Sequence, residues 1–458
     1  MKKMIKILLA IWLVVFIVGC TTNENGKEVD IEDGDGDGDD IDIEETFKDT
    51  VYISTEEHIR GLADLVNSGS DYFDEKIIVM TNDITLSQNH TPIGKAAGKF
   101  TSTFDGNGYS ISNLSVERTQ YAGLFGYVGE GGRIRNLTVN VVEITAGGTT
   151  ANYAGGLAGY YASTKAIVNC GVNIKNEILA YCSYESYAGG LIGKTVTDIT
   201  INNSYSTGGL VIAHNSGSTT SGSDNYAGGL IGQAYNNIEI TYCYAMTKVS
   251  ANTTVSSIPG GLVGTGFSAS GGLVGLAQKD IDITNSYTTG DIVGNTNIGG
   301  LIGEVKGKTT INYSYTTGYV HGSNYNGSGS GGLVGHSGAI IIGNSYSEGD
   351  VSASNSSNAG GLVGIAKTLE ITVTDCHSTG DVRGSWSGGL IGYVSGWPTT
   401  VTTIKDSYTT GNVSANGEDS GNAGGLIGSG TGSIFIDNSH ATGNVSAFSY
   451  AGGFMGYG

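Results

Sequence analysis

The feature that most constrains the fold is a five-residue motif, Gly424-Gly425-Leu426-Ile427-Gly428, which we call the pentad. It recurs along the chain with nearly the same sequence. Its period of roughly 30 residues indicates a solenoid, a propeller or another array of stacked units. The central residues of the copies are Leu124, Leu157, Leu191, Leu230, Leu262, Leu273, Leu301, Leu333, Leu362, Leu390, Leu426 and Phe454.

A second string lies between successive pentads and contains two apolar residues spaced by two, such as Ile281 and Ile283, followed by a small residue, Ser286. A spacing of two indicates a strand with one face inward. The odd step from Ile283 to Ser286 breaks that alternation, so we expect a corner at Asn285. The small residues form one inward column: Cys170, Ser204, Cys243, Ser286, Ser314, Ser345, Cys376, Ser407 and Ser439.

Each repeat therefore offers three short strands, formed by the pentad, the Ile-x-Ile segment and a following Gly-x-Val segment. Three strands repeated in register predict an all-β fold, a parallel, right-handed β-helix solenoid of about a dozen coils. The composition of 77 Gly, 3 Pro and 14% charged residues suits short strands and tight turns. A propeller is the alternative, but each blade would need a fourth strand and about 40 residues.

An amphipathic helix is predicted ahead of the first coil, over the segment from Thr55 to Asn67. Ser54 or Thr55 is placed to cap its N-terminus, and Gly69 is placed to end it. Such a helix would cover the open edge of the first coil, which otherwise invites edge-to-edge pairing. The residues expected on its buried face are Ile59, Leu62, Leu65 and Val66.

The pentads, together with Pro92-Ile93-Gly94 and the segment from Phe100 to Gly108, resemble the GLUG-motif repeats of bacterial cell-surface proteins. The likeness covers nearly everything from Val51 onward. Such repeats also occur in large adhesin-like chains and beside the protease domain of IgA-cleaving metallopeptidases. The resemblance implies a β-structured surface protein and little about activity.

The N-terminus resembles a bacterial lipoprotein signal peptide. A basic leader is followed by an apolar run from Ile7 to Val18 and by Gly19-Cys20, which matches a lipobox. By that resemblance, cleavage before Cys20 leaves a diacylglycerol-modified cysteine, and several acyl chains anchor durably. The expected location is the cell surface or outer membrane. An ordinary secretory signal and an uncleaved anchor are the alternatives.

The next segment, 21–46, is acidic and nearly free of large apolar residues, so we expect a disordered tether. Within it, Asp33, Asp35, Asp37 and Glu44 fit the ligand spacing of an EF-hand-like calcium loop. Asp40 occupies a place that is normally apolar, and flanking helices are missing, which favours a solvated tether over a calcium site. No other cofactor is expected.

These observations divide the chain into four parts: a signal peptide (1–19), a lipidated cysteine with its tether (20–46), a cap with the first coils (47–121) and the GLUG-type β-helix (122–458). The chain stops two residues after a pentad, so we expect either further coils in a longer chain or self-association. Leu262 and Leu273 are too close in sequence to enclose a full coil, so the solenoid should be least regular there.

An aromatic column stands just outside the small column and is the candidate binding site. One interpretation is a platform for sugar rings or a partner protein. The other, which we favour, is a ladder of like side chains that stabilises neighbouring coils. The column consists of Tyr205, Tyr244, Tyr287, Tyr315, Tyr346, His377, Tyr408 and His440.

The cysteines of the small column, Cys170, Cys243 and Cys376, are not in adjacent coils, so they should remain buried, unpaired thiols. Cys182 lies in an irregular segment and could instead meet Cys170. No Cys-x-x-Cys spacing suggests a metal site.

The sequence favours a non-catalytic adhesin or binding scaffold for glycans or proteins, with a polysaccharide-degrading lyase or hydrolase as the alternative. Acidic residues such as Asp291, Asp350 and Asp381 recur at one coil position, which is typical of a turn or surface ladder rather than of a catalytic cluster. His-Glu-x-x-His is absent, and His336 and His377 lack partners at an informative spacing. A net charge of −20 argues against a nucleic-acid partner.

Overall fold

The computed structural model describes residues 49–148, 150–182, 185–215, 224–252, 268–323, 327–354, 357–367, 370–396, 400–417 and 421–458. The predicted signal peptide, Cys20 and the candidate calcium ligands Asp33, Asp35, Asp37 and Glu44 lie outside these ranges. Within the described residues, no helix is both long and apolar enough to cross a membrane.

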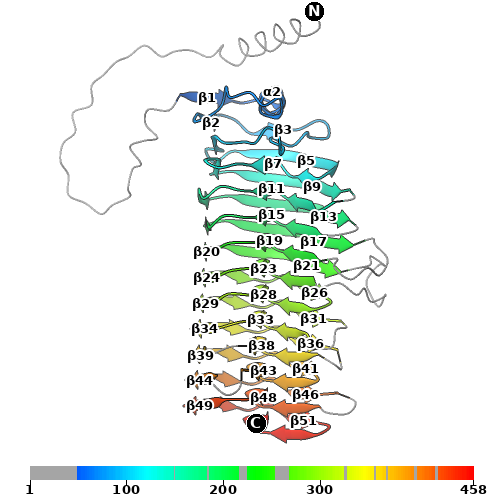
Figure 1. Ribbon diagram of the computed structural model, residues 1–458, viewed down its shortest axis with the longest axis vertical. Coiled ribbons are helices and arrows are strands. Elements are labelled where there is room, and N and C mark those ends of the chain that lie inside the picture. The colour runs from blue at the N-terminus through cyan, green and yellow to red at the C-terminus, as the bar shows by residue number, and fades with distance from the viewer. Residues whose placement is uncertain are drawn as a thin grey trace, which may run out of the picture.

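The chain forms a rod of stacked coils (Figure 1). A representative coil consists of β18 (Asn225–Gly228), β19 (Ile231–Ala234), β20 (Ile238–Thr241) and β21 (Tyr244–Asn252). Each strand pairs in parallel with its counterpart in the next coil, as in Ile231 with Val274 and Ile240 with Ile283. The fold is therefore an all-β, parallel β-solenoid, as predicted.

The strands stack into four sheets, which we number in the order in which a coil passes through them. The first sheet has 11 strands: β6 (Tyr121–Ala122), β10 (Asn152–Gly155), β14 (Ser186–Gly189), β18, β22 (Ser268–Gly271), β27 (Asn297–Gly299), β32 (Gly329–Gly331), β37 (Asn358–Gly360), β42 (Trp386–Gly388), β47 (Asn422–Gly424) and β52 (Tyr450–Gly452).

The second sheet also has 11 strands: β7 (Phe125–Val128), β11 (Ala158–Tyr161), β15 (Ile192–Thr195), β19, β23 (Val274–Ala277), β28 (Ile302–Val305), β33 (Val334–Ser337), β38 (Val363–Lys367), β43 (Ile391–Ser395), β48 (Ile427–Gly430) and β53 (Met455–Tyr457).

The third sheet contains the Ile-x-Ile segments and has 13 strands: β1 (Thr50–Ile53), β2 (Ile77–Met80), β4 (Thr103–Asp105), β8 (Arg133–Arg135), β12 (Ile167–Val168), β16 (Ile199–Asn202), β20, β24 (Ile281–Thr284), β29 (Thr309–Asn312), β34 (Ile340–Gly343), β39 (Glu370–Thr374), β44 (Val401–Lys405) and β49 (Ser433–Asp437).

After a first strand of two residues, the fourth sheet consists of long strands and then of pairs of short ones, because from the coil that contains Tyr287 onward each strand is interrupted near a glycine such as Gly290. Its strands are β3 (Ile84–Thr85), β5 (Ser110–Thr119), β9 (Thr138–Gly147), β13 (Gly171–Cys182), β17 (Tyr205–Asn215), β21, β25 (Tyr287–Thr288), β26 (Ile292–Gly294), β30 (Tyr315–Thr316), β31 (Val320–Gly322), β35 (Tyr346–Ser347), β36 (Val351–Ala353), β40 (His377–Ser378), β41 (Val382–Gly384), β45 (Tyr408–Thr409), β46 (Val413–Ala415), β50 (His440–Ala441) and β51 (Val445–Ala447).

The pentad is a corner rather than a strand, so the prediction of three strands per coil is wrong in this detail. In Gly299–Gly303, the first glycine ends β27 and Ile302 begins β28. The intervening Leu301 is fully buried, and its carbonyl accepts hydrogen bonds from the N–H groups of Leu273 and Val274 at 2.8 and 3.0 Å. The two glycines let successive backbones approach closely at this corner.

The predicted corner before the small column is confirmed. Asn285 has a φ of 51°, in the left-handed region that asparagine tolerates better than most residues. The adjacent Ser286 is buried; its hydroxyl accepts from the N–H of Cys243 at 3.1 Å and donates to the carbonyl of Thr284 at 2.8 Å. The same corner conformation occurs at Asn169, Asn203, Tyr242, Tyr313, Asn344, Asp375, Asp406 and Asn438.

One pentad of the irregular pair belongs to the stack. The N–H of Leu230 donates to the carbonyl of Leu273 at 2.8 Å, and β18 pairs with β22, so Leu273 supplies the next inward position after Leu230. Leu262 lies outside the described residues.

The helix α2 (Glu56–Asn67) confirms the predicted cap. Thr55 is its N-cap, and the side chain of Thr55 accepts from the N–H of His58 at 3.4 Å. One apolar cluster runs from this helix through the rod to Ile427, so the cap and the coils share a core. Leu65 is only partly buried; the buried apolar residues of the helix are Ile59, Leu62, Ala63 and Val66.

His90 joins the cap region to the first pentad, and its ring contacts the carbonyl of Leu124 at 2.9 Å through Nε2. Burial lowers the pKa of His90 from 6.5 to about 4; the hydrogen bond to Leu124 and the charge of Glu56 oppose this shift, and Arg60 adds to it. The folded protein therefore holds this ring neutral at a pH where the unfolded chain takes up a proton.

We expect His90 to make the folded state pH-sensitive. The contribution of neutral His90 to the free energy of unfolding is complete above pH 6.5. It falls by about 3 kcal/mol as the pH drops from 6.5 towards 4. Chemical denaturation across this range should show a shallower pH dependence for His90→Gln, which retains a donor for Leu124. An identical pH slope in the wild type and the variant would contradict this assignment.

Candidate functional site

The predicted aromatic column forms one continuous stack along the rod. Each ring follows the corner residue by two positions, and parallel pairing places successive rings opposite each other, as in Tyr287 with Tyr315. Ring centroids are 4.8–5.3 Å apart and the planes differ by 1–8°. The stack includes every member of the predicted set: Tyr205, Tyr244, Tyr287, Tyr315, Tyr346, His377, Tyr408 and His440.

The flat faces of these rings are largely covered. Each inner ring lies between two others, and Tyr205 lies over Gly171, where an added Cβ would be 2.3 Å from the Tyr205 ring. Burial raises the pKa of Tyr315 and lowers that of His377, so the neutral forms are favoured. Only ring edges and hydroxyl groups face outward, which suits a stabilising ladder better than a platform for sugar rings.

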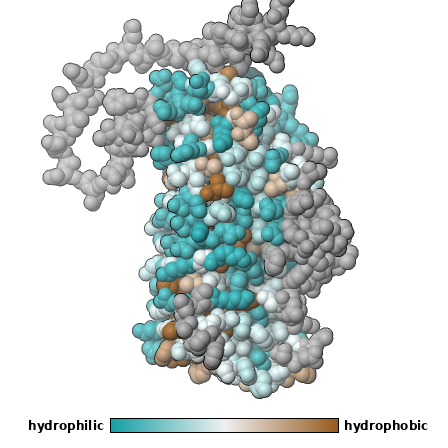
Figure 2. Space-filling view, viewed as in Figure 1, coloured by the Kyte–Doolittle hydropathy of each residue, from teal (hydrophilic) through white to brown (hydrophobic). Residues whose placement is uncertain are grey.

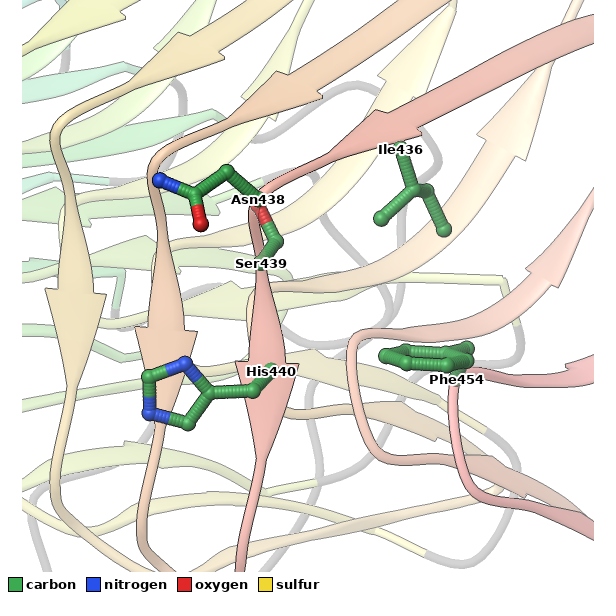
Figure 3. Close-up of a pocket in the computed structure, with 5 residues that line it drawn as sticks. All are labelled: Ile436, Asn438, Ser439, His440 and Phe454. Carbon is green, nitrogen blue, oxygen red and sulfur yellow. The ribbon is translucent and has the colours of Figure 1, made fainter.

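The last ring, His440, is exposed. It lines an open hollow of about 440 Å³ together with Ile436, Asn438, Ser439 and Phe454 (Figure 3). The hollow contains one titratable side chain, so it offers no acid–base pair.

A second aromatic group, the tyrosine cluster, fills the angle between the first and second sheets. Tyr121 and Tyr153 stack with centroids 5.3 Å apart, Tyr153 and Tyr187 at 5.2 Å, and Tyr187 and Tyr226 at 5.7 Å. Tyr160 of the second sheet meets Tyr153 edge-on at 5.1 Å. The sequence signal for this cluster is the Tyr-Ala that directly precedes several pentads, as at Tyr153, Tyr187 and Tyr226.

Charged groups complete the tyrosine cluster. Lys194 Nζ lies 4.2 Å from the Tyr187 ring centroid and donates to the Tyr187 hydroxyl at 3.2 Å. The Tyr187 hydroxyl donates in turn to Glu185. Burial raises the pKa of Tyr187 and lowers that of Lys194. Because Tyr187 is only 1% exposed, the centre of this cluster is packed rather than open.

Farther along the second sheet, Glu304, Lys306 and His336 form a small polar cluster. Glu304 Oε1 accepts from Lys306 Nζ and lies 3.4 Å from His336 Nδ1. Burial alone would raise the pKa of Glu304, but the hydrogen bonds from His336 and Lys306 outweigh it and hold this pKa at about 2. The Nε2 atom of His336 is buried and has no hydrogen-bond partner within the described part of the chain.

The recurring acidic residues form the expected surface ladder. Asp350 accepts from the N–H of Asp381 at 2.8 Å, and Asp381 accepts from the N–H of Asn412 at 2.8 Å. These carboxylates therefore bind backbone donors of the following coil. Within the described ranges, no three His, Cys, Asp or Glu side chains are grouped to hold a metal ion.

The four described cysteines are buried and take part in no disulfide bond, so the alternative bridge between Cys170 and Cys182 is not formed. Burial raises the pKa of Cys170 and Cys243 to about 12 and that of Cys376 to about 11.

We therefore expect Cys170, Cys243 and Cys376 to resist iodoacetamide at pH 8 in the folded protein and to react quickly in denaturant, because the thiolate is the nucleophile. Peptide mass spectrometry would follow each site separately. Fast native-state labelling of Cys243 would contradict the burial that the coil imposes.

No protein-family model matches the chain. A 115-residue segment is 35% identical to halomucin of Haloquadratum walsbyi, covering 22% of this chain and 1% of halomucin. A 62-residue segment is 44% identical to a protein of Evansella cellulosilytica assigned as a Gly-rich membrane protein, covering 13% of this chain and 7% of that protein. The chain thus spans only a small part of these curated relatives.

Among solved structures, a Bacteroides ovatus protein assigned as an immunoglobulin A1 protease is similar, with a TM-score of 0.42 and 18% sequence identity. The likeness covers 58% of this chain and 75% of that one.

Proposed function

We propose that this protein is a lipid-anchored GLUG-type surface protein whose rod is a non-catalytic binding scaffold for glycans or proteins. The observation that carries the proposal is the register of the coils. Outward side chains at one coil position stand in line with a spacing near 5 Å, as the aromatic stack demonstrates. Solenoids use such extended faces to bind long ligands through repeated contacts.

The surface supports this proposal. The face in Figure 2 is mainly hydrophilic, with small separate apolar areas, which is typical of a chain that displays polar contacts to solvent. The local likenesses to halomucin and to an assigned membrane protein agree with an extracytoplasmic location.

A glycan and host-protein array tests the binding function, with reducing-end release measured on every hit. Binding without release is expected. Release that persists in highly purified protein would instead favour the enzyme alternative.

That alternative has one observation in its favour, the Glu304–His336 pair. A carboxylate that contacts an imidazole is a recurring acid–base arrangement, but the unpaired Nε2 of His336 is buried, so a substrate reaches it only if the second sheet opens locally. If the protein releases sugar ends, Glu304→Gln and His336→Gln should abolish release while leaving binding intact.

The anchor is tested separately. Cys20→Ala, expressed in a bacterial host with a lipoprotein pathway, should move the protein from the membrane fraction to the soluble extracytoplasmic fraction. Undiminished membrane retention would contradict the lipid anchor and leave the binding function open.

A further inference from the structure

Two tyrosines stand where the other coils place asparagine or aspartate. Tyr242 and Tyr313 precede the small column and have φ values of 54° and 49°. Bulky L-residues rarely adopt this left-handed conformation, whereas Asn and Asp do so more readily because their short side chains bond locally. Tyrosine is thus locally unfavourable at both corners, and such strain is often retained for function.

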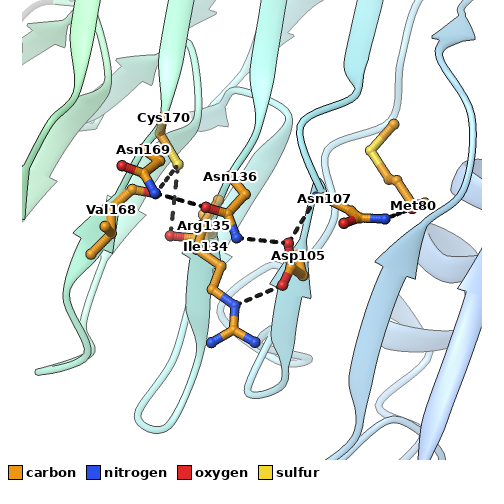
Figure 4. A network of polar contacts seen from close by, with 9 residues as sticks. All are labelled: Met80, Asp105, Asn107, Ile134, Arg135, Asn136, Val168, Asn169 and Cys170. Carbon is orange, nitrogen blue, oxygen red and sulfur yellow. Dashed lines mark hydrogen bonds and ion pairs between the residues drawn. The ribbon is translucent and has the colours of Figure 1, made fainter. Parts of the chain in front are cut away.

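The tyrosines also interrupt a ladder of side-chain hydrogen bonds that joins the corner residues of successive coils. Asn169 Nδ2 donates to Asn136 Oδ1 at 2.9 Å, and Asn136 Nδ2 donates to Asp105 Oδ1 at 3.1 Å (Figure 4). Asn203 extends this ladder by donating to Asn169 at 2.7 Å. The next corner residue is Tyr242, whose side chain has no amide to continue the ladder.

Both rings lie in solvent instead. Tyr242 and Tyr313 are each 60% exposed, well above the half-buried rings of the aromatic stack. Within the described residues, neither ring stacks on another aromatic ring. Their exposed surfaces are therefore open to an external partner.

The two rings stand in line along the rod. The N–H of Tyr242 donates to Thr284 and that of Asn285 to Asn312, so Tyr242, Asn285 and Tyr313 occupy three successive coils. Two steps of roughly 4.8 Å place the tyrosines about 10 Å apart. On the strands that lead into these corners, Glu239 and Asp282 are exposed and opposite each other on β20 and β24, three residues before Tyr242 and Asn285.

We propose that Tyr242 and Tyr313 form a binding site for a neutral, extended polysaccharide of β-linked pyranoses that lies along the rod. Each tyrosine ring stacks on the flat apolar face of a sugar. The separation of the two rings is close to the length of a disaccharide unit in such a chain. Asn285 lies between the rings, and the Glu239 and Asp282 carboxylates accept hydrogen bonds from sugar hydroxyls.

The negative charge of the protein favours neutral glycans over anionic ones. The chain carries a net charge of −20, and Glu239 and Asp282 are exposed on the strands that lead into the corners, so an anionic polysaccharide would be repelled. A neutral chain meets no such repulsion. This inference rests on the proposed binding function and assigns it a ligand class and a site.

The double variant Tyr242→Asn/Tyr313→Asn tests the site, because it restores the usual corner residue and should fold as well as the wild type. Calorimetry with cellohexaose and chitohexaose should show binding of at least one of them by the wild type. Binding should be at least tenfold weaker for the double variant, whose unfolding midpoint should be equal or higher. Maltohexaose, an α-linked coil, should bind poorly.

Tyr235→Asn is the matched control, because Tyr235 is 55% exposed but lies outside this corner; its affinity should be unchanged. Equal affinity of the wild type and the double variant would overturn the site while leaving the scaffold function standing. Failure of the wild type to bind either β-linked hexasaccharide would overturn the ligand class. The scaffold function would then be tested separately by the glycan and protein array. A lower unfolding midpoint for the double variant would overturn the premise of strain.

Discussion

Replacement of Gly300 by alanine is expected to destabilise the rod by about 3 kcal/mol, because the pentad corner has no room for a side chain. A Cβ at Gly300 would lie 2.0 Å from the carbonyl oxygen of Gly332 in the next coil and 2.7 Å from the Thr316 side chain. A backbone atom cannot rotate away as a flexible side chain can, so the two coils would have to separate. Denaturant unfolding, followed by the loss of β-sheet circular dichroism, measures the effect.

Two other glycines separate the effect of space from that of conformation. Gly453 has the same place in its pentad, but an added Cβ would meet nothing within 4 Å, so Gly453→Ala should be nearly neutral. Gly108 also has free space but a φ of 83°, so Gly108→Ala should cost about 1–2 kcal/mol through backbone strain alone. If Gly300→Ala proved no more harmful than Gly453→Ala, close backbone contact would not explain why glycine recurs in this chain's pentads.

The architecture was predictable because a repeat constrains every coil at once. The period indicated stacking, the apolar pair Ile281 and Ile283 indicated an inward face, and the parity break before Ser286 located a corner that the φ of Asn285 confirms. The alternation of inward and outward side chains could not show whether the pentad itself is a strand or a corner. A strand and a corner differ there only in backbone angles, and glycines carry no side chain whose direction could reveal the difference.

Some contacts within the repeat pattern were harder to predict. Glu304 and His336 each directly follow the last glycine of a pentad and meet because β28 and β33 pair in register. This position carries unlike residues in other coils, such as Gln233 and Leu276, so the sequence showed no column there. The tyrosine cluster depends on the angle between two sheets, which a single sequence does not specify. By contrast, the aromatic stack was identified because its position in the repeat carries the same kind of side chain, Tyr or His, in successive coils.

The triple variant Tyr287→Ser/Tyr315→Ser/Tyr346→Ser is expected to destabilise the protein by about 2–6 kcal/mol, since it removes four stacked ring pairs worth about 0.5–1.5 kcal/mol each. Additional apolar surface would become exposed along the fourth sheet. Thermal and denaturant unfolding measure the loss, and partial unfolding at intermediate denaturant would show whether the central coils separate first, as expected for nearest-neighbour stacking.

Tyr235→Ser is the control for this triple variant, since Tyr235 is 55% exposed and has no ring partner among the described residues; its effect should stay within about 0.5 kcal/mol. Affinity for the β-linked hexasaccharides should survive in the triple variant at temperatures where it remains folded, because the exposed rings of Tyr242 and Tyr313 lie outside the stack. The opposite result, lost glycan binding with unchanged stability, would make the stack itself the ligand platform. The covered rings of the aromatic stack would then bind the glycan, and the exposed rings of Tyr242 and Tyr313 would have no assigned function.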